Sequence, residues 1–294
     1  MAFSINRNAS LMNLFYDDRD DSVHQRRGSR ILYWLDDLKG IPIAESQSDS
    51  DDGFFFSVAG SISDYAELVA DHPNLRDRAE ERLPLMSLAS VLDCLAAKSV
   101  DVPMSRTWRL AWNEPIPDDI VYPLFVRASD SSLKLGGAIS RVRNANELLL
   151  EAEEIRRLLG WNAMVIAREW KECVPAGTGT YGVLPQEIRV WVVDGKPFAW
   201  SFQHLKEVPL PAGFPPTTAD LQQLATYAER VAVAFASRCL VVDFAREVQR
   251  GWTFVDAGSA SSAVTDHEGV FKAVASKLIG KKFPFHSDKV GGLF

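Results

Sequence analysis

The chain has 294 residues, of which 47% are hydrophobic and 24% charged, so it can bury a sizeable core, and disordered or collagen-like chains are excluded. The formal net charge of −7 argues against nucleic acid as the main ligand, because a phosphate backbone is bound by a surplus of Lys and Arg. No window approaches roughly 18 uninterrupted apolar residues, so we expect no membrane span.

The cysteines and the start of the chain bear on the compartment. Cys94, Cys173 and Cys239 are far apart, odd in number and without Cys-x-x-Cys spacing, which is typical of a reducing compartment. The first residues hold no apolar run of signal-peptide length. We therefore expect a cytoplasmic protein whose three thiols are small packed residues.

The first eighty residues carry few signals. Residues 31–35 are consistent with either a helix or a buried strand, and 54–58 are a strand candidate. The acidic stretch 46–52 lacks the Gly and terminal Glu of a calcium loop, so a solvated linker is the better interpretation.

The middle of the chain alternates helix and strand signals. From Pro84, leucines recur at helical spacing through Leu95, and 102–108 reads as extended. Residues 120–127 form a β-rich run, which a Ser/Gly-rich loop, 128–137, follows. A short strand is expected at 138–140.

Two further elements follow in the same region. We expect Asn146 to cap a helix that ends at Leu159 and is closed by Gly160. Residues 164–170 then form another strand.

The last third contains the clearest hairpin signal. Strands at 187–193 and 197–202 flank Asp194-Gly195, a dipeptide that favours a tight primed turn. Thr217 or Thr218 caps a helix to about Ala236. Strands follow at 240–245 and 253–256, and the Gly-rich end reads as a tail. Because the best-defined link is a hairpin, the pattern predicts an α+β fold with antiparallel sheets.

Two carboxylates in the last hairpin are the most informative feature. With a turn centred between Gln249 and Arg250, Asp243 and Asp256 face each other with Cβ atoms roughly 4.5–5.5 Å apart. Such a pair requires a proton, a basic side chain or a metal, and magnesium shared with phosphates is one solution. The alternatives are that one Asp points outward or pairs with Arg246.

Other charged residues lie at strand ends. Arg127 ends a strand before the Ser/Gly-rich loop that holds Lys134, a combination suited to a polyphosphate but also to an ordinary turn. No Walker-type or Gly-x-Gly-x-x-Gly motif is present. Arg168 and Glu169, beside a tryptophan, suit an adenine pocket or a sheet edge. Arg189 marks either a polar groove or an exposed sheet face.

Taken in order, these segments resemble the ATP-grasp superfamily, and within it the R-two-K clade, in which Arg replaces the usual lysine at the end of the first lid strand. The likeness runs from about Pro84 to Lys282. The stretches that carry it are Val102-Pro-Met-Ser, Tyr122-Pro-Leu-Phe-Val-Arg127, Ser132-Leu-Lys134-Leu-Gly136-Gly137, Arg168-Glu169, Glu187-Ile-Arg189-Val-Trp-Val-Val-Asp-Gly195, Val241-Val-Asp243-Phe-Ala and Phe254-Val-Asp256-Ala-Gly258.

The resemblance implies two α+β subdomains that hold ATP between them, behind a small N-terminal α/β region. We place the N-terminal region at 1–118, the ATP lid subdomain at 119–186 and the C-terminal subdomain with the metal site at 187–294. It also implies an ATP- and magnesium-dependent carboxylate–amine ligase, which forms an amide or peptide bond through an acyl phosphate. Its partners would be ATP and small-molecule or peptide substrates.

Residue roles follow by position from the resemblance. The side chains implied to bind the nucleotide are Arg127 and Lys134 at the phosphates and Arg168 and Glu169 near the adenine or ribose. Arg189 would act in catalysis, by stabilising the transferred phosphoryl group or the substrate carboxylate. Asp243 and Asp256 would hold magnesium.

Two departures from the family pattern keep other functions open. The final acidic position is usually Glu and is Asp256 here, and many family members have a metal-binding Asn where this chain has Gly258. The alternative is a catalytically weak or inactive nucleotide-binding or interaction module of the same fold. A kinase-like phosphotransfer to a small molecule is a third hypothesis.

Overall fold

The computed structural model describes residues 79–129, 141–179, 182–203, 208–209, 214–260, 263, 267–278 and 284–294, and the backbone of three short strands near the N-terminus. The expectations for 31–35, for the acidic stretch 46–52, for the strand at 138–140 and for Lys134 lie outside the described residues.

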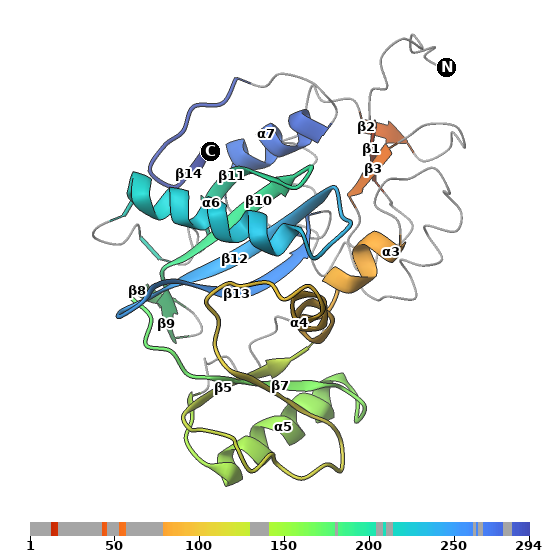
Figure 1. Ribbon diagram of the computed structural model, residues 1–294, viewed down its shortest axis with the longest axis vertical. Coiled ribbons are helices and arrows are strands. Elements are labelled where there is room, and N and C mark those ends of the chain that lie inside the picture. The colour runs from red at the N-terminus through yellow and green to blue at the C-terminus, as the bar shows by residue number, and fades with distance from the viewer. Residues whose placement is uncertain are drawn as a thin grey trace.

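A five-stranded sheet, called the large sheet below, forms the centre of the molecule (Figure 1). Its strands are antiparallel and in the order β13-β12-β10-β11-β14. Their bounds are β10 Glu187–Val193, β11 Lys196–Phe202, β12 Cys239–Glu247, β13 Gly251–Ser259 and β14 Gly291–Leu293. The predicted β10–β11 hairpin is confirmed, with positive φ angles at Asp194 (50°) and Gly195 (74°) as a primed turn requires.

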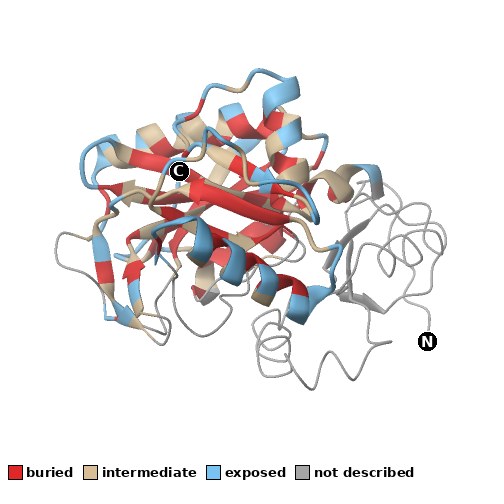
Figure 2. Cartoon of the chain, turned by 90° about the horizontal axis from the view of Figure 1, so that it is seen from below, coloured by how far each residue is buried: buried red, intermediate tan, exposed pale blue. Residues whose placement is uncertain are grey.

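Each face of the large sheet packs against a helix. Alternate residues of a strand point to opposite faces, so Ile188 and Val190 join one apolar cluster with α6 (Thr218–Ala232), while Trp191 and Val193 join another with α7 (Glu268–Leu278). Buried residues are concentrated along these strands (Figure 2). The α6 helix begins after Thr217, as predicted, and ends at Ala232 rather than near Ala236; α7 was not predicted.

A four-stranded sheet, called the small sheet, lies below the large sheet, at the bottom of the view in Figure 1. Its order is β4-β7-β5-β6, with bounds β4 Thr107–Leu110, β5 Leu124–Ala128, β6 Arg141–Val142 and β7 Val165–Glu169. Helix α5 (Ala145–Leu159) packs its apolar face on this sheet. Its N-cap is Asn144, not Asn146 as predicted, because the Asn144 side chain accepts a hydrogen bond from Glu147 N at 3.0 Å.

Helix α4 (Leu88–Ala97) lies between the two sheets (Figure 1). Its side chains Val91 and Leu95 enter the α6-side core of the large sheet. Its first backbone amides reach the small sheet, since Leu88 N donates to Ser129 O at 2.7 Å and Ala89 N to Ser129 Oγ at 3.0 Å. The predicted helical leucines therefore belong to α4 and to a 3₁₀ turn, Leu83–Leu85, that precedes it, after the short helix α3 (Ala79–Arg82).

The remaining strands lie outside these two sheets. The hairpin of β8 (Pro175–Gly179) and β9 (Gly182–Pro185), which was not predicted, follows the small sheet in the chain. Strands β1 (Asn13–Tyr16), β2 (Ile43–Glu45) and β3 (Gly53–Phe56) pair in parallel. With helices and antiparallel sheets in both main parts, the α+β prediction is confirmed. Among the described residues, none of the helices has the length and apolar character needed to cross a bilayer.

The segment predicted to be a tail instead completes the large sheet. Gly291, the first residue of β14, lies so close to His267 that an added Cβ would clash with the imidazole ring. The His267 ring accepts from Val270 N through Nδ1 at 3.2 Å, so the proton is on Nε2, which donates to Asp288 at 3.1 Å. Asp288 also accepts from Val290 N (2.8 Å) and Gly291 N (2.9 Å).

Asp288 should therefore make the attachment of β14 sensitive to acid. Burial opposes ionisation, but the bonds from Val290 N, from His267 and from Gly291 N outweigh it and lower the pKa of Asp288. A carboxyl whose pKa is lowered by folding contributes stability above its unfolded pKa of about 3.9 and loses it as pH falls.

We expect Asp288→Asn to lower the melting temperature at pH 6, and the difference from the wild type to shrink as the pH falls to about 3, below the unfolded pKa of a carboxyl. Thermal scans over this range measure it. Asp101→Asn, which changes a carboxylate that is 98% exposed, is the control. A difference between wild type and Asp288→Asn that stays constant with pH would contradict the assignment.

Candidate functional site

The β12–β13 hairpin brings the two predicted aspartates opposite each other, but not through the turn that was expected. Glu247 pairs with Gly251, so the turn is centred on Gln249, and Gly251 has φ 82°. Continued without interruption, that register would place Val255 opposite Asp243. A β-bulge between Asp243 and Phe244 leaves Val255 as an extra residue and pairs Asp243 with Asp256. The predicted pairing is confirmed, and the bulge is its cause.

Asp243 is held by an arginine from the neighbouring strand. Arg189 on β10 is its register partner, and the guanidinium donates from Nε to Oδ1 at 2.8 Å and from Nη2 to Oδ2 at 2.7 Å. The two side chains are only 15% and 10% exposed. Burial works against the charge of Arg189, but the Asp243 carboxylate more than compensates and raises the pKa of Arg189. The contact is a buried, bidentate pair in which burial raises the pKa of Asp243 against the attraction of Arg189.

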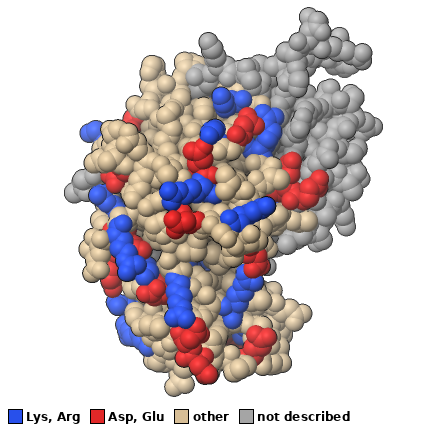
Figure 3. Space-filling view, viewed as in Figure 1, with Lys and Arg blue, Asp and Glu red and all other residues tan. Residues whose placement is uncertain are grey.

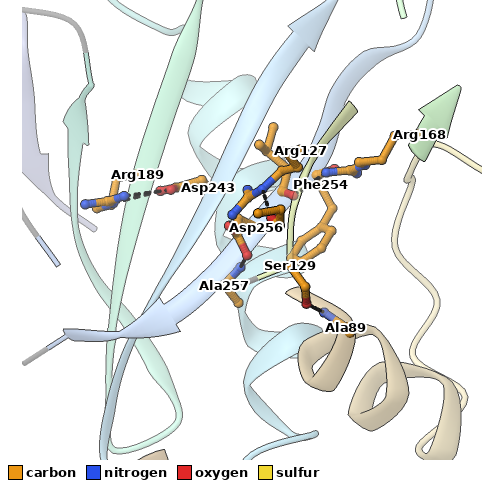
Figure 4. Close-up of polar contacts among 11 residues, drawn as sticks. Ala89, Arg127, Ser129, Arg168, Arg189, Asp243, Phe254, Asp256 and Ala257 are labelled. Carbon is orange, nitrogen blue, oxygen red and sulfur yellow. Dashed lines mark hydrogen bonds and ion pairs between the residues drawn. The ribbon is translucent and has the colours of Figure 1, made fainter. Parts of the chain in front are cut away.

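Asp256 is held by an arginine from the small sheet. Arg127 on β5 donates from Nη1 to Asp256 Oδ2 at 2.8 Å, while Oδ1 accepts from Ala257 N at 2.9 Å. Figure 4 shows the two aspartates turned toward different arginines, Asp243 toward Arg189 and Asp256 toward Arg127. The Arg127–Asp256 pair thus joins the small sheet to the large one.

Ser129 fixes the end of the strand that carries Arg127. Its carbonyl and hydroxyl accept the first amides of α4, and its own amide donates to Met164 O at 2.9 Å. Ser129 is 4% exposed, so these bonds are shielded from water. Sequence reasoning did not single out Ser129, because its role depends on α4, a helix that starts forty residues earlier in the chain.

Arg168 on β7 reaches the same place but bonds to the backbone. Its side chain is 5% exposed. Nη2 donates to Phe254 O at 2.9 Å and Nη1 donates to Val255 O (Figure 4). Burial lowers the pKa of Arg168 to about 10, against the attraction of Asp256, so the group is protonated at neutral pH.

Glu169, the other residue predicted near an adenine, lies elsewhere. Its Oε2 is 2.9 Å from Lys171 Nζ, and this bond is the main cause of the lowered pKa of Glu169. Both residues line a cavity of about 530 Å³ formed with α4, residues 104–107, Arg109 and Arg250. None of the two aspartates and three arginines described above lines it, so the cavity is separate from the acidic pair.

The acidic pair is suited to the protein's share of a magnesium–nucleotide site. Mg²⁺ is commonly held by one or two carboxylates together with substrate phosphates and waters. Among the residues that the structure describes, no group of three or more potential ligands is present, so phosphates and waters would complete the shell. Each carboxylate oxygen has two lone pairs and retains one beside its hydrogen bond from an arginine or amide.

Positive and negative side chains are interspersed on the face of the molecule seen in Figure 3, without a large area of one sign. The four charged groups of the site follow the same rule, since Arg127 and Arg189 balance Asp256 and Asp243. A polyanion bound at this place would therefore offer Arg127 and Arg189 an alternative acceptor for the hydrogen bonds that they now donate to the aspartates. Lys134, the remaining predicted phosphate contact, lies outside the described residues.

Comparison with known proteins identifies the class of this fold. A family model described as an ATP-grasp domain, R-two-K clade family 3, matches residues 76–278, more than half of the chain. The fold is thus that of the ATP-grasp proteins. The chain belongs to family 3 of their R-two-K clade, as the sequence resemblance predicted.

Solved structures agree with this assignment. A D-alanine–D-alanine ligase from Bacillus anthracis has a TM-score of 0.60 at 12% identity. The superposition covers 91% of this chain and 96% of the ligase chain. The same ligase complexed with ATP gives 0.57 at 14% identity, with 92% and 95% covered. The ligase from Coxiella burnetii gives 0.56 at 14%, with 79% and 68% covered. At these identities the likeness shows the fold. No curated protein matches the sequence.

Proposed function

We propose that the protein is an ATP- and magnesium-dependent carboxylate–amine ligase. The observation that carries the proposal is the meeting of Asp243, Asp256, Arg127 and Arg189 at the junction of the two sheets. Membership of the R-two-K clade of ATP-grasp domains and the shared fold of the D-alanine–D-alanine ligases support it.

The proposed reaction has two steps. A substrate carboxylate oxygen attacks the γ-phosphorus of ATP, which breaks the bond to the β,γ-bridging oxygen and yields an acyl phosphate and ADP. An amine nitrogen then attacks the acyl carbon, the carbon–oxygen bond to phosphate breaks, and the amine loses a proton. Both steps move negative charge among phosphate oxygens, so they depend mainly on positioning and charge neutralisation.

The side chains have complementary roles in this proposal. Arg127 would bind nucleotide phosphates, and Arg189 would stabilise the transferred phosphoryl group or the substrate carboxylate. Asp243 and Asp256 would hold magnesium, which when bound neutralises phosphate charge. Glu169 would lie by the adenine or ribose, with Lys134 at the phosphates.

The existing ion pairs suggest how the site receives its ligand. In the structure, each aspartate is paired with an arginine. With a nucleotide and its cation, the arginines would turn toward phosphate and the cation would take their place at the carboxylates. This exchange keeps every charge paired, which a site as little exposed as Asp243 requires.

The test is ATP binding by calorimetry with and without millimolar magnesium, followed by hydroxylamine trapping of acyl phosphate with a panel of amino acids and peptides. We expect magnesium to strengthen ATP binding and at least one acid to yield a trapped hydroxamate. The absence of ATP binding in the presence of magnesium would refute the proposal.

A second candidate is nucleotide binding without ligation. It is favoured by the pairing of both aspartates with arginines and by the lack of a third ligand among the described residues. Gly258, opposite Val241, also has no side chain to add a ligand. Tight magnesium-dependent ATP binding with no hydroxamate and no ADP, whatever the acid, would support this candidate over the ligase.

A further inference from the structure

Arg168, on strand β7 of the small sheet, reaches the backbone at the outer edge of β13. Phe254 N donates to Pro103 O on that edge at 2.7 Å. The carbonyl of the same residue points to the same side in a strand, and there it accepts from Arg168 Nη2 at 2.9 Å. The neighbouring carbonyl, of Val255, accepts from Nη1 of the same guanidinium.

These two carbonyls lie at the bulge. Val255 is the extra residue, which a bulge leaves without a partner in the ladder. Arg168 is 5% exposed, so water has little access to its bonds, and a buried carbonyl without a donor is strongly unfavourable. Among the described side chains, Arg168 is the one shown to donate to both carbonyls, so it supports the irregular backbone of β13 alongside the backbone bridge between Phe254 and Met104.

We propose that Arg168 is a positioning residue that holds the bulge at Val255 and thereby keeps Asp256 opposite Asp243. Without the bulge, the register set by the turn places Val255 opposite Asp243, and a slip of one residue moves a side chain to the other face of a strand. Asp256 would then leave both Asp243 and Arg127. The consequence for a magnesium–nucleotide site rests on the proposed function; the hold on β13 does not.

Arginine is the residue type that this role requires. Its planar guanidinium presents two donors in a fixed geometry, which matches two adjacent acceptors, whereas the ammonium group of lysine is a point charge without such a fork. The protonated state of the buried group is consistent with this role. Lysine at this position would retain the charge but hold the two carbonyls together poorly.

The chain offers a matched control. Arg156 on α5 is 7% exposed and donates from Nη2 to another backbone carbonyl, Leu110 O, at 2.6 Å, within the small sheet and away from β13. The test compares Arg168→Lys and Arg168→Met with Arg156→Met. If Arg168→Met does not fold, Arg168→Lys carries the test, since it preserves the charge and most of the volume.

The first measurement is amide hydrogen exchange in the ligand-free protein. We expect both Arg168 variants to exchange the amides of residues 254–257 at least about tenfold faster than the wild type, with the β10–β11 hairpin unchanged, because the opening is local. Arg156→Met should leave the β13 amides as they are. Wild-type protection of β13 in Arg168→Met, or the same loss in Arg156→Met, would overturn the proposal.

The second measurement is the affinity for ATP with and without magnesium. The gain in affinity that magnesium gives should fall by about tenfold or more in both Arg168 variants, as for other residues that orient metal ligands. The magnesium-free affinity is the reference: an equal loss with and without magnesium would mean that Arg168 binds the nucleotide directly, as the sequence resemblance implied, and would overturn the link to the acidic pair. An unchanged magnesium gain would overturn the link to the acidic pair. If the wild type binds no ATP, the proposed function fails and the exchange measurement alone decides.

Discussion

Asp243→Asn should lower ATP turnover by at least about a hundredfold, because it removes one of two carboxylates from the proposed phosphoryl-transfer site, which would depend on charge neutralisation. The substitution preserves shape and volume but removes the carboxylate that Arg189 binds through two nitrogens. Since the Arg189–Asp243 pair is 15% and 10% exposed, we also expect the free energy of unfolding to fall by about 3–5 kcal/mol. Steady-state ADP release and urea unfolding measure the two effects.

Asp194→Asn is the matched control for this substitution. Asp194 also accepts two bonds from an arginine, Arg238, but the pair lies at the β10–β11 turn with the Asp194 side chain 51% exposed. Asparagine tolerates the positive φ at this position. Turnover should stay at the wild-type level. Near wild-type turnover in Asp243→Asn itself would remove Asp243 from the site.

Replacing both members of the buried pair should separate stability from function. Arg189→Met alone leaves the Asp243 carboxylate buried and unpaired and should cost about 3–5 kcal/mol. The double variant Arg189→Met with Asp243→Leu removes both charges, and a buried ion pair exchanged for apolar residues is often neutral or stabilising. We therefore expect its free energy of unfolding to return to within about 1 kcal/mol of the wild type.

The same double variant should show no magnesium-dependent ATP turnover, because it has neither the carboxylate nor the arginine. Denaturant unfolding followed by tryptophan fluorescence measures stability, and ADP release measures turnover. A stable, inactive double variant would mean that the pair is retained for chemistry rather than for folding. If the double variant is as unstable as Arg189→Met, the pair contributes to the fold in its own right.

The parts of the fold that sequence predicted well depend on local signals. Three such signals lie within a few residues of the structure that they predict. They are the Asp194-Gly195 turn, the Thr217 cap and the alternation of Ile188, Val190 and Val192. The cap of α5 was misplaced by two residues because Asn144 and Asn146 offer the same side chain, and only the bond to Glu147 N distinguishes them. The end segment reads as a tail because its glycines give no periodic signal, whereas the small size of Gly291 is what allows its contact with His267.

The candidate site shows a different limit. Position in the sequence predicted the pairing of Asp243 with Asp256, yet the turn it assumed lies half a residue away and the bulge corrects the register. The bulge could not be read from the strand itself, because its donor, Arg168, comes from a strand eighty residues earlier. Each arginine partner likewise comes from another strand, so the charges could be predicted as a set but not as specific pairs.

The connection between the sheets has a kinetic consequence. Residues 172–174, which follow the small sheet, bind the end of β12 through the backbone bonds Val174 N to Arg246 O and Val248 N to Glu172 O. Arg127 and Arg168 of the small sheet also bind β13 of the large sheet. In the proposed function the nucleotide would bind between the two sheets, and it could enter only after these hydrogen bonds break. The observed rate constant of nucleotide association should then reach a plateau at high nucleotide concentration. At the plateau, the opening of the protein limits the rate, not the encounter with the nucleotide.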